Sequence, residues 1–413
     1  MKKQQKSVFA LALLVAIDGM GFGLLIPVLF PLLMDTHSSL LSAATSSTLR
    51  HFYMAIALSI FPLCALLGTP LLGALSDRFG RKKILSLCLL GSFWGYSISA
   101  LGIFVNSFAV FLIGRMLAGA TFGSQPIAQA AIADANSLQH KALNMSLISF
   151  AMTLSITLGP LLGGYLTDPS ISPYFNNTTP FIVAAILALL NAIWLWLAYV
   201  DADQPRAQAH LGHLLRELKL LWQVALVKRL LVVFFLLEIG WSFYFQSVGL
   251  LLQDWYHFSS VQIGNFLSYS GLWMCFGLLV LFRWLYKVMS LQMIAKGFLG
   301  LAFIGLIFCA TATHAHQQWL GVILVAIAVG IAYTALVTLL SNAMAVTLQG
   351  RVMGVAGSLL TGAWMLTGFL GPLLAVKNVA LPFYCAVLAF ALGIILILIK
   401  LPVLLRQPCS ESE

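Results

Sequence analysis

The chain has 413 residues, of which 61% are hydrophobic and only 8% are charged. Soluble domains carry about a quarter charged residues, so this composition excludes an ordinary soluble protein and indicates one that crosses a membrane many times. The formal net charge of +10 would suit nucleic-acid binding, but the basic residues are placed as a membrane protein places them.

Apolar runs of about 20 residues recur along the whole chain, and each could span roughly 30 Å of hydrocarbon as a helix. The sequence therefore predicts an all-α integral membrane protein with 12 transmembrane helices. The runs lie at about 7–33, 52–75, 83–104, 108–134, 143–167, 179–200, 229–252, 260–283, 291–312, 318–346, 352–376 and 380–402.

The lysine and arginine residues predict the orientation. With the N-terminus inside, 19 of the 22 fall in cytoplasmic segments or at cytoplasmic helix ends. Arg50 and Lys377 fall outside, and Arg115 lies within a span. Basic residues collect on the cytoplasmic side of membrane proteins, so we expect a multi-pass protein of the cell inner (cytoplasmic) membrane with both termini in the cytoplasm.

The first span contains a carboxylate near the middle of the membrane. Asp18 lies 12 residues after Lys6, which is roughly 18 Å along a helix. An ionised carboxylate at that depth costs at least a few kcal/mol, and burial favours its protonated form. We therefore expect Asp18 to face a watery cavity, to pair with a base or to carry a proton.

Residues 68–83 join the second and third spans by a short loop that is rich in charge. Asp77, Arg78, Gly80 and Arg81 belong to it, and two lysines follow. So short a loop cannot bury its charges in a fold of its own, so they must meet the ends of neighbouring helices. The loop is thus predicted to be a conformational latch.

Arg115 in the fourth span is the only base deep in a predicted helix, about 13 Å from the outer loop. It could reach Asp18 within the N-terminal half. Three roles stay open: a permanent buried ion pair, a switch in which protonation of Asp18 frees Arg115, or direct contact with substrate. Asp134 lies at the cytoplasmic end of the same span.

A polar segment divides the chain into two halves. We predict an N-terminal six-helix bundle at 1–200, a cytoplasmic linker with an amphipathic helix at 201–228, and a C-terminal six-helix bundle at 229–413. Gly159-Pro160-Leu161-Leu162 recurs as Gly371-Pro372-Leu373-Leu374 in the corresponding span of the second half. Such a repeat indicates two parallel-related bundles.

The seventh span holds a second deep carboxylate. Glu238 lies nine residues after Arg229, roughly 14 Å along a helix, and has no obvious basic partner in its own half. We expect it to carry a proton or to bind a cationic substrate. The alternative is a neutral acid that is hydrogen-bonded to a neighbouring helix.

Polar and aromatic side chains within the spans are candidates to line a substrate cavity, although each could also pack against lipid or protein. Tyr244 and Gln246 stand out because they follow Glu238 closely. The candidates are Gln125, Gln129, Trp241, Tyr244, Gln246, Tyr269, Tyr333, Asn342 and Trp364.

Several motifs together resemble one transporter family. The run from Gly73 to Lys83 is similar to the signature G-x-x-x-D-R-x-G-R-[KR]-[KR] of the major facilitator superfamily. Within it, Asp18-x-x-Gly21-x-Gly23, Gly114-Arg115-x-x-x-Gly119 and Gly159-Pro160-x-x-Gly163-Gly164 resemble the twelve-helix drug:proton antiporters, especially tetracycline-efflux-like members. The resemblance covers essentially the whole chain.

The resemblance implies roles for the latch and for the glycine motif. Arg81 would pair with Asp134, and Asp77 would meet the start of span 11 near 351–354, where the helix dipole favours an anion. These contacts would tie the halves together on the cytoplasmic side. Gly159, Pro160, Gly163 and Gly164 would pack helices closely, and the resemblance also implies that they seal the cavity against proton leak.

The sequence carries no phosphate-binding loop and no hydrolase or zinc-protease motif, and its six cysteines lack metal-like spacing. We therefore expect neither an enzyme nor a receptor or scaffold, and no metal or cofactor beyond the proton gradient. The expected partners are a small-molecule substrate, protons and the lipid bilayer, with no nucleic acid, and the protein is expected to be a monomer.

The expected function is proton-coupled secondary active transport by alternating access. The leading hypothesis is export of a small lipophilic or amphipathic, drug-type compound in exchange for protons. The alternative is a proton-linked importer or exporter of a polar metabolite or a carboxylate siderophore, for which Arg115 is available.

Overall fold

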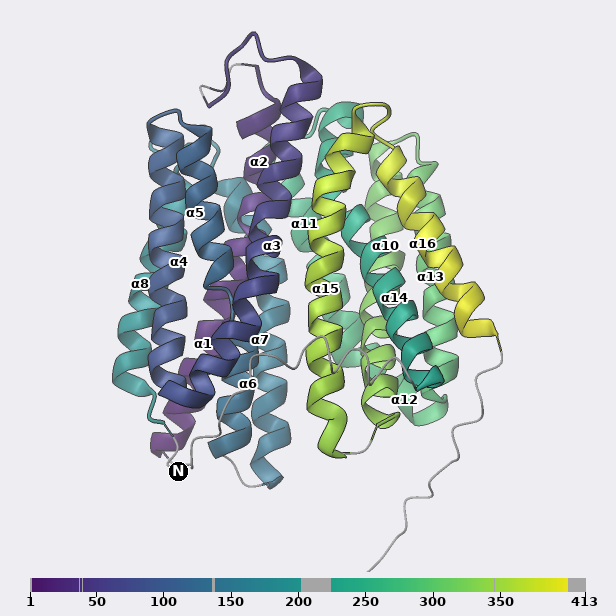
Figure 1. The fold of residues 1–413 in the computed structure, drawn as a ribbon. Helices are drawn as coiled ribbons and strands as arrows, with labels where there is room; N and C mark the ends of the chain where they lie inside the picture. The colour runs from purple at the N-terminus through teal and green to yellow at the C-terminus, as the bar shows by residue number, and fades with distance from the viewer. Residues whose placement is uncertain are drawn as a thin grey trace, which may run out of the picture.

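The computed structural model describes residues 2–36, 38, 40–135, 138–201, 224–344 and 346–399. The regular elements in these ranges are all helices (Figure 1). The first half contains α1 (Lys2–Gly23), α2 (Leu25–Met34), α3 (Ser47–Phe79), α4 (Arg81–Phe104), α5 (Phe108–Ala120), α6 (Ser124–Ala135), α7 (Leu138–Tyr165) and α8 (Thr179–Ala198). The second contains α10 (Ala225–Tyr256), α11 (Ser260–Phe276), the π-helix η2 (Gly277–Leu281), α12 (Phe282–Val288), α13 (Leu291–Ala310), α14 (Ala315–Asn342), α15 (Val346–Ala375) and α16 (Leu381–Leu398).

These helices account for all twelve predicted spans. In the described ranges, nine helical segments are long and apolar enough to cross a membrane. The other three predicted spans are helical as well: α5 with α6, α7, and α10. The prediction of an all-α integral membrane protein with twelve transmembrane helices is confirmed. The ends differ by a few residues; α10 begins at Ala225 and α14 ends at Asn342.

The helices gather in two groups, with α1–α8 on one side of Figure 1 and α10–α16 on the other. Contacts between the groups run mainly through α7 with α11 and α3 with α15. This arrangement fits the two bundles expected from the repeat. Most of the predicted linker, residues 202–223, lies outside the described residues, so the domain boundaries stay a prediction.

Two of the spans are broken, and a proline follows each break. The first breaks at Leu24, between α1 and α2, and the fourth breaks between Ala120 and Ser124. Pro27 and Pro126 follow these breaks and have no N–H to bond the carbonyl four residues earlier. In the fourth span that carbonyl belongs to Phe122, and it accepts a hydrogen bond from the Thr69 hydroxyl of α3 at 2.5 Å.

The hydrogen bond from Thr69 is required, because lipid offers no donor to a backbone carbonyl that has lost its helical partner. The neighbouring Gly68 lets α3 come close enough: a side-chain carbon there would lie 2.1 Å from the carbonyl oxygen of Ala120. Thr69 and Gly68 begin the stretch that ends in the latch. The same helix therefore supports the break in the fourth span and carries the latch.

Apolar side chains fill the inside of both groups of helices. A small apolar cluster joins α1, α4, α6, α7 and α8 toward the predicted cytoplasmic side, and Leu11, Leu14, Leu85 and Leu195 belong to it. The outer surface is also apolar, with Leu67 71% exposed and Leu197 79% exposed. That surface is expected of helices that face lipid.

Arg50, one of the two basic residues predicted to lie outside, is buried and fully engaged. Its Nη1 donates to the carbonyls of Leu33 (3.0 Å) and Asp35 (2.9 Å), its Nη2 donates to that of Ser42 (2.9 Å), and its Nε donates to that of Thr45 (3.3 Å). The guanidinium therefore closes the end of α2 and folds the following loop. This local role explains the exception to the charge rule.

We predict that Arg50→Ala destabilises the protein by about 3 kcal/mol, because several carbonyls lose a charged donor. A clear drop in the melting temperature of the purified protein would show this loss. Lys377→Ala is the matched control, since Lys377 is the other outer base and is exposed. Equal melting temperatures for the two variants would contradict the structural role of Arg50.

Candidate functional site: two buried carboxyl groups and the latch

Asp18 lies inside the first group of helices, 2% exposed. Its carboxyl accepts hydrogen bonds from Ser92 of α4, at 3.0 Å, and from Ser124, the first residue of α6. Ser124 is in reach because the fourth span breaks just before it. The start of a helix also favours a negative charge, so this position can hold either protonation state of Asp18.

Arg115 does not pair with Asp18 in this structure. The guanidinium is fully buried and lies over the Phe61 ring at 4.7 Å. None of its three nitrogens has a hydrogen-bond partner among the described residues. Of the three roles left open, the ion pair of Asp18 with Arg115 is not formed in this structure, where the Asp18 carboxyl accepts from two serine hydroxyls instead. The switch and the contact with substrate stay predictions.

Glu238 lies in α10 and is 3% exposed. Trp364 of α15 approaches it, with its indole nitrogen 3.4 Å from a carboxyl oxygen. A line of hydrogen bonds continues from this level: Thr367 donates to Ser242 at 2.8 Å, and Gln246 donates to Thr367 at 2.9 Å and to the Trp364 carbonyl at 3.1 Å. Glu238 is therefore bonded to a neighbouring helix, and α10 and α15 share one polar seam.

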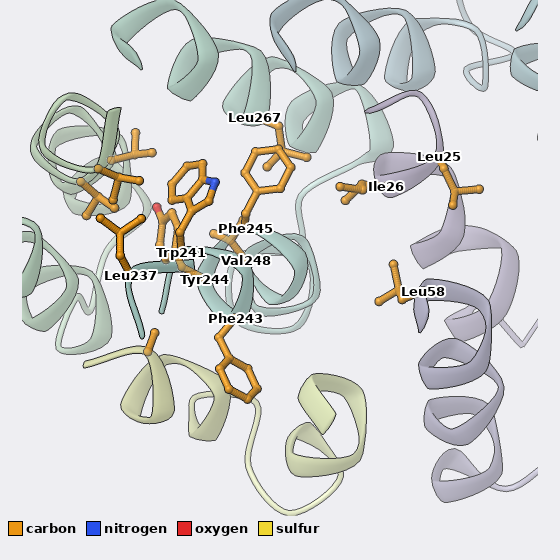
Figure 2. Packing of buried hydrophobic residues seen from close by; sticks show 14 of the residues in the cluster. Leu25, Ile26, Leu58, Leu237, Trp241, Phe243, Tyr244, Phe245, Val248 and Leu267 are labelled. Atoms are coloured by element: carbon orange, nitrogen blue, oxygen red, sulfur yellow. The ribbon is translucent and has the colours of Figure 1, made fainter. Parts of the chain in front are cut away.

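Figure 2 looks along α10 and shows Trp241 and Phe245 on one side of the helix and Phe243 on another. Phe245 packs between Trp241 (5.2 Å between ring centres) and Trp364 (5.7 Å). The rings therefore make an apolar wall beside Glu238. Leu58 of α3 and Ile26 of α2 lie across from this part of α10.

Tyr244 lies beside Trp241, with 6.0 Å between the ring centres, and its role as a cavity residue stays a prediction. Its ring packs on Phe383 of α16 at 5.4 Å, and its hydroxyl is 4.0 Å from the sulfur of Cys309 in α13. Two residues along a helix turn the direction by about 200°. Gln246, which bonds α15, and Tyr244, which packs on α13 and α16, therefore lie on different sides of α10.

The other predicted cavity residues lie on several helices, and their role stays a prediction. Gln125 and Gln129 are half-buried on α6. Tyr269 of α11 packs against a tryptophan of α14 at 5.2 Å, and Tyr333 of α14 packs against a phenylalanine of α10 at 5.6 Å. Asn342 is the last residue of α14 and is exposed.

The latch forms a tight turn between α3 and α4. Gly80 has a φ of 100°, which residues with a side chain rarely adopt, and its N–H donates to the Ser76 carbonyl at 3.1 Å. Arg81 pairs with Asp77 at 2.5 Å and also donates to the Ser76 hydroxyl at 2.6 Å. Arg78 lies over the Phe79 ring at 5.2 Å.

The expected contact of Asp77 with the start of α15 is not found among the described residues, which leave out the side chains of 345–348 and 350. Asp77 is paired inside its own loop, and a side-chain carbon at Gly354 or Gly357 of α15 would meet open space. The contact of Asp77 with α15 therefore stays a prediction. The side chain of Asp134 lies outside the described residues, so its pairing with Arg81 remains a prediction.

Asp201 is a latch residue that the sequence reasoning did not single out. Its carboxyl accepts the backbone N–H of Lys82 at 2.9 Å, at the start of α4. The Lys82 ammonium donates to the Trp196 carbonyl of α8 at 2.8 Å. An acid just before a polar segment is a weak signal, because only the fold shows which helix start it reaches.

The glycine motif on α7 brings three helices together. A side-chain carbon on Gly159 would lie 2.9 Å from the Cα of Gly23, and one on Gly163 would lie 2.2 Å from the carbonyl oxygen of Leu24. On another side of α7, one on Gly164 would lie 2.6 Å from the carbonyl oxygen of Ser260 in α11. The motif therefore packs helices as expected, whereas its sealing role stays a prediction.

Close contacts between the two halves lie toward the predicted outer side. They include Gly164 with Ser260, Pro160 with Gly264, and Leu58 with Gly368. The latch, by contrast, lies at the other end of α3, and side-chain carbons at Gly354, Gly357 or Gly362 of α15 would meet no atom within 4 Å. In the described part of the chain, this arrangement corresponds to halves that meet on the outer side and part on the cytoplasmic side.

Twelve helical passages in two groups, with deep carboxyl groups and a charged loop at one end, define a multi-pass membrane transporter. The family profile described as Major Facilitator Superfamily matches residues 11–372. The chain belongs to this superfamily, so it is a transporter and not an enzyme.

The chain is similar to tetracycline resistance proteins. It is 28% identical to the class B protein of Escherichia coli over 48% of this chain and 45% of that protein. It thus spans less than half the length of that relative, and the same holds for class C (34% identical, 43% and 41%). The class D protein of Salmonella ordonez matches at 28% identity over 87% of this chain and 86% of that protein.

Solved structures share the fold. The human organic anion transporter MFSD10 (TETRAN) superposes with a TM-score of 0.70 at 22% identity, covering 95% of this chain and 99% of that one. A D-xylose-proton symporter superposes with a TM-score of 0.77 at 16% identity, covering 96% and 98%. At these identities the likeness shows the fold alone.

We predict that Gly163→Ala disrupts the junction of α7 with α1 and α2, because the new carbon would meet backbone rather than a flexible side chain. Overpacking of this kind costs about 1–3 kcal/mol, so the melting temperature should fall. Gly297→Ala is the control, since nothing lies within 4 Å of that position. A helical glycine in open space gains about 0.5–1 kcal/mol on becoming alanine, so the control should not fall.

Proposed function

We propose that the protein exports a small lipophilic or amphipathic compound in exchange for protons, by alternating access. The observation that carries the proposal is a pair of deep carboxyl groups, one in each half. Asp18 and Glu238 are both buried, and the only ion pair found in the described part of the chain is that of Arg81 with Asp77. The resemblance to tetracycline resistance proteins supports export.

A carboxyl group without a basic partner is suited to carry a proton across hydrocarbon. Its ionised form needs water, since burial of the charge costs at least a few kcal/mol. Its protonated form can be enclosed by hydroxyl and indole groups such as those around Asp18 and Glu238. Closure over the group therefore favours proton uptake, and exposure to water favours release.

Arg115 would link the protonation of Asp18 to a change in conformation. Its buried guanidinium has no hydrogen-bond partner among the described residues, which is costly in an apolar interior. Ionised Asp18 would attract it, and protonated Asp18 would not. We propose that protonation of Asp18 thereby biases the position of α5, which carries Arg115.

A second candidate function is proton-linked transport of a polar or carboxylate-bearing metabolite or siderophore. The same unpartnered guanidinium favours it, because arginine binds carboxylates with two parallel hydrogen bonds. The solved relative whose title names an organic anion transporter supports this alternative in the same way. The sign of the substrate charge separates the two candidates.

We further propose that the protein resides in the inner membrane with both termini in the cytoplasm. The distribution of lysine and arginine supports this orientation, and bacterial relatives such as the class D protein support the location. No cofactor is proposed, because the proton gradient supplies the free energy. Protons and the small-molecule substrate are the proposed partners of a monomer in the bilayer.

Transport by purified protein in proteoliposomes with an imposed pH gradient tests the proposal. Tetracycline, ethidium and fluorescein serve as amphipathic, cationic and anionic probes. Movement of a probe against the direction of the protons would support antiport, and movement with them would contradict it. Transport of fluorescein alone would favour the second candidate.

We predict that Glu238→Gln reduces transport driven by the pH gradient at least tenfold, because an amide keeps the shape of the carboxyl but does not release a proton. Exchange of labelled for unlabelled probe, without a gradient, should persist. Asp254→Asn is the matched control, because Asp254 lies on the same helix near its exposed end. Wild-type coupling in Glu238→Gln would remove Glu238 from the mechanism.

A further inference from the structure

Asn191 of α8 is a buried amide whose hydrogen-bonding groups are not satisfied by the described residues. The residue is 1% exposed. Its Oδ1 and its Nδ2 are both buried and have no hydrogen-bond partner among the described residues. An amide in an apolar environment without hydrogen bonds costs several kcal/mol, and lipid cannot supply them. The amide therefore requires a hydrogen-bond partner other than the described protein groups.

The neighbours of Asn191 are apolar. It shares the buried face of α8 with Ala188, Ala192 and Leu195, and the last two belong to the small apolar cluster with Leu11 and Leu14 of α1. A lone amide in such a cluster contributes nothing to apolar packing. Its presence points to a bound polar molecule.

The contacts between α1 and α8 place Asn191 close to the level of Asp18. Ser7 donates to the Ala198 carbonyl at 3.3 Å, near one end of the pair. Gly21 and Ala184 line one small cavity near the other end. Counting between these points puts Asn191 opposite Leu14, about one helical turn or roughly 6 Å from the level of Asp18, on the predicted cytoplasmic side.

The chemistry of the amide selects the bound molecule. Oδ1 requires a donor and Nδ2 requires an acceptor. A cation would satisfy only the first and an anion only the second, whereas one water molecule can serve both. A buried water commonly makes about three hydrogen bonds to otherwise unsatisfied groups.

Ser92 offers a third partner for such a water. It packs from α4 on Asp18, and its hydroxyl keeps lone pairs that can accept a hydrogen bond while it donates to the carboxylate. Cys88 lies one turn earlier on α4, toward the level of Asn191, and is fully buried. The remaining groups near Asp18 are Tyr96 of α4 beside Gly21, Ser124 of α6 and Ser155 of α7 beside Gly19.

We propose that Asn191 binds a buried water between α1, α4 and α8, and that this water relays protons between Asp18 and the predicted cytoplasmic side through Ser92. The relay rests on the proposed proton coupling, and the water site does not. In the relay, protonated Asp18 gives its proton to the Ser92 oxygen while Ser92 gives its own proton to the water, and that water passes the extra proton to bulk water that enters from the predicted cytoplasmic side. Asp18 then stands ionised and accepts from Ser92, which is the bond seen in the structure.

The water site is tested by the stability of Asn191→Leu, because leucine matches the branched shape of asparagine without its polar atoms. A dry, unsatisfied amide destabilises the wild type, so the leucine variant would then melt higher. A hydrated amide loses its hydrogen bonds in the variant, so the melting temperature should stay equal or fall. A clear rise would overturn the water site, and this measurement needs no substrate.

The relay is tested in the proteoliposome assay, with whichever of the three probes the wild type transports. Asn191→Leu should slow transport driven by the pH gradient at least tenfold and leave gradient-free exchange within twofold. Asn191→Ser should restore coupling, since its hydroxyl donates and accepts and leaves room for a second water. Wild-type coupling in Asn191→Leu would overturn the relay.

A control and a fallback keep the two proposals apart. Ser99→Ala removes another buried hydroxyl of α4, which bonds the Gly95 carbonyl at 2.9 Å on the outer side of Asp18, and should couple normally. If the wild type drives none of the three probes with a pH gradient, the proposed function and the relay both fail. The melting temperatures would still decide the water site.

Discussion

A carboxyl group in hydrocarbon must be hydrogen-bonded by the protein itself. The arrangement of the N-terminal half depends on how Asp18 meets this requirement. One of its donors, Ser124, exists at that place only because the fourth span breaks and a new helix begins there. Pro126 follows the break, and the carbonyl that it cannot bond, that of Phe122, accepts a hydrogen bond from Thr69 of α3. Since α3 also carries the latch, a shift of this helix would change the surroundings of Asp18 and of the cytoplasmic surface at the same time.

The surroundings of the second carboxyl group, Glu238, depend on the contact between the two halves. Glu238 is approached by Trp364, and the polar seam of Gln246 and Thr367 lies next to it on α15. The same stretch of α15 contacts α3 of the other half, at Gly368 and Leu58. The environment of Glu238 is therefore tied to how the halves meet, whereas that of Asp18 is enclosed within one half. This difference suits two carboxyl groups that act at different moments of one cycle.

Much of the fold could be predicted from the sequence, because hydropathy and the thickness of the bilayer fix where helices must lie. The depth of Asp18 and Glu238 followed from residue counts for the same reason. The partners of the candidate residues could not be predicted: Asp18 bonds serines rather than Arg115, Asp77 pairs with Arg81, and Tyr244 packs on Phe383 of α16. Each of these outcomes depends on the rotation of a helix or on a break that a residue count leaves open.

The sequence by itself determined the family, the twelve transmembrane helices and the presence of a charged latch, since each of these follows from local patterns of hydropathy, charge and glycine. Only the tertiary structure decided which side the halves meet on, that Asp201 caps α4, and that Asn191 lies about one turn from the level of Asp18 without a hydrogen-bond partner among the described residues. The physical reason is that a hydrogen bond needs atoms within about 3 Å. Residues as distant in sequence as Lys82 and Asp201 reach that separation only through the packing of whole helices.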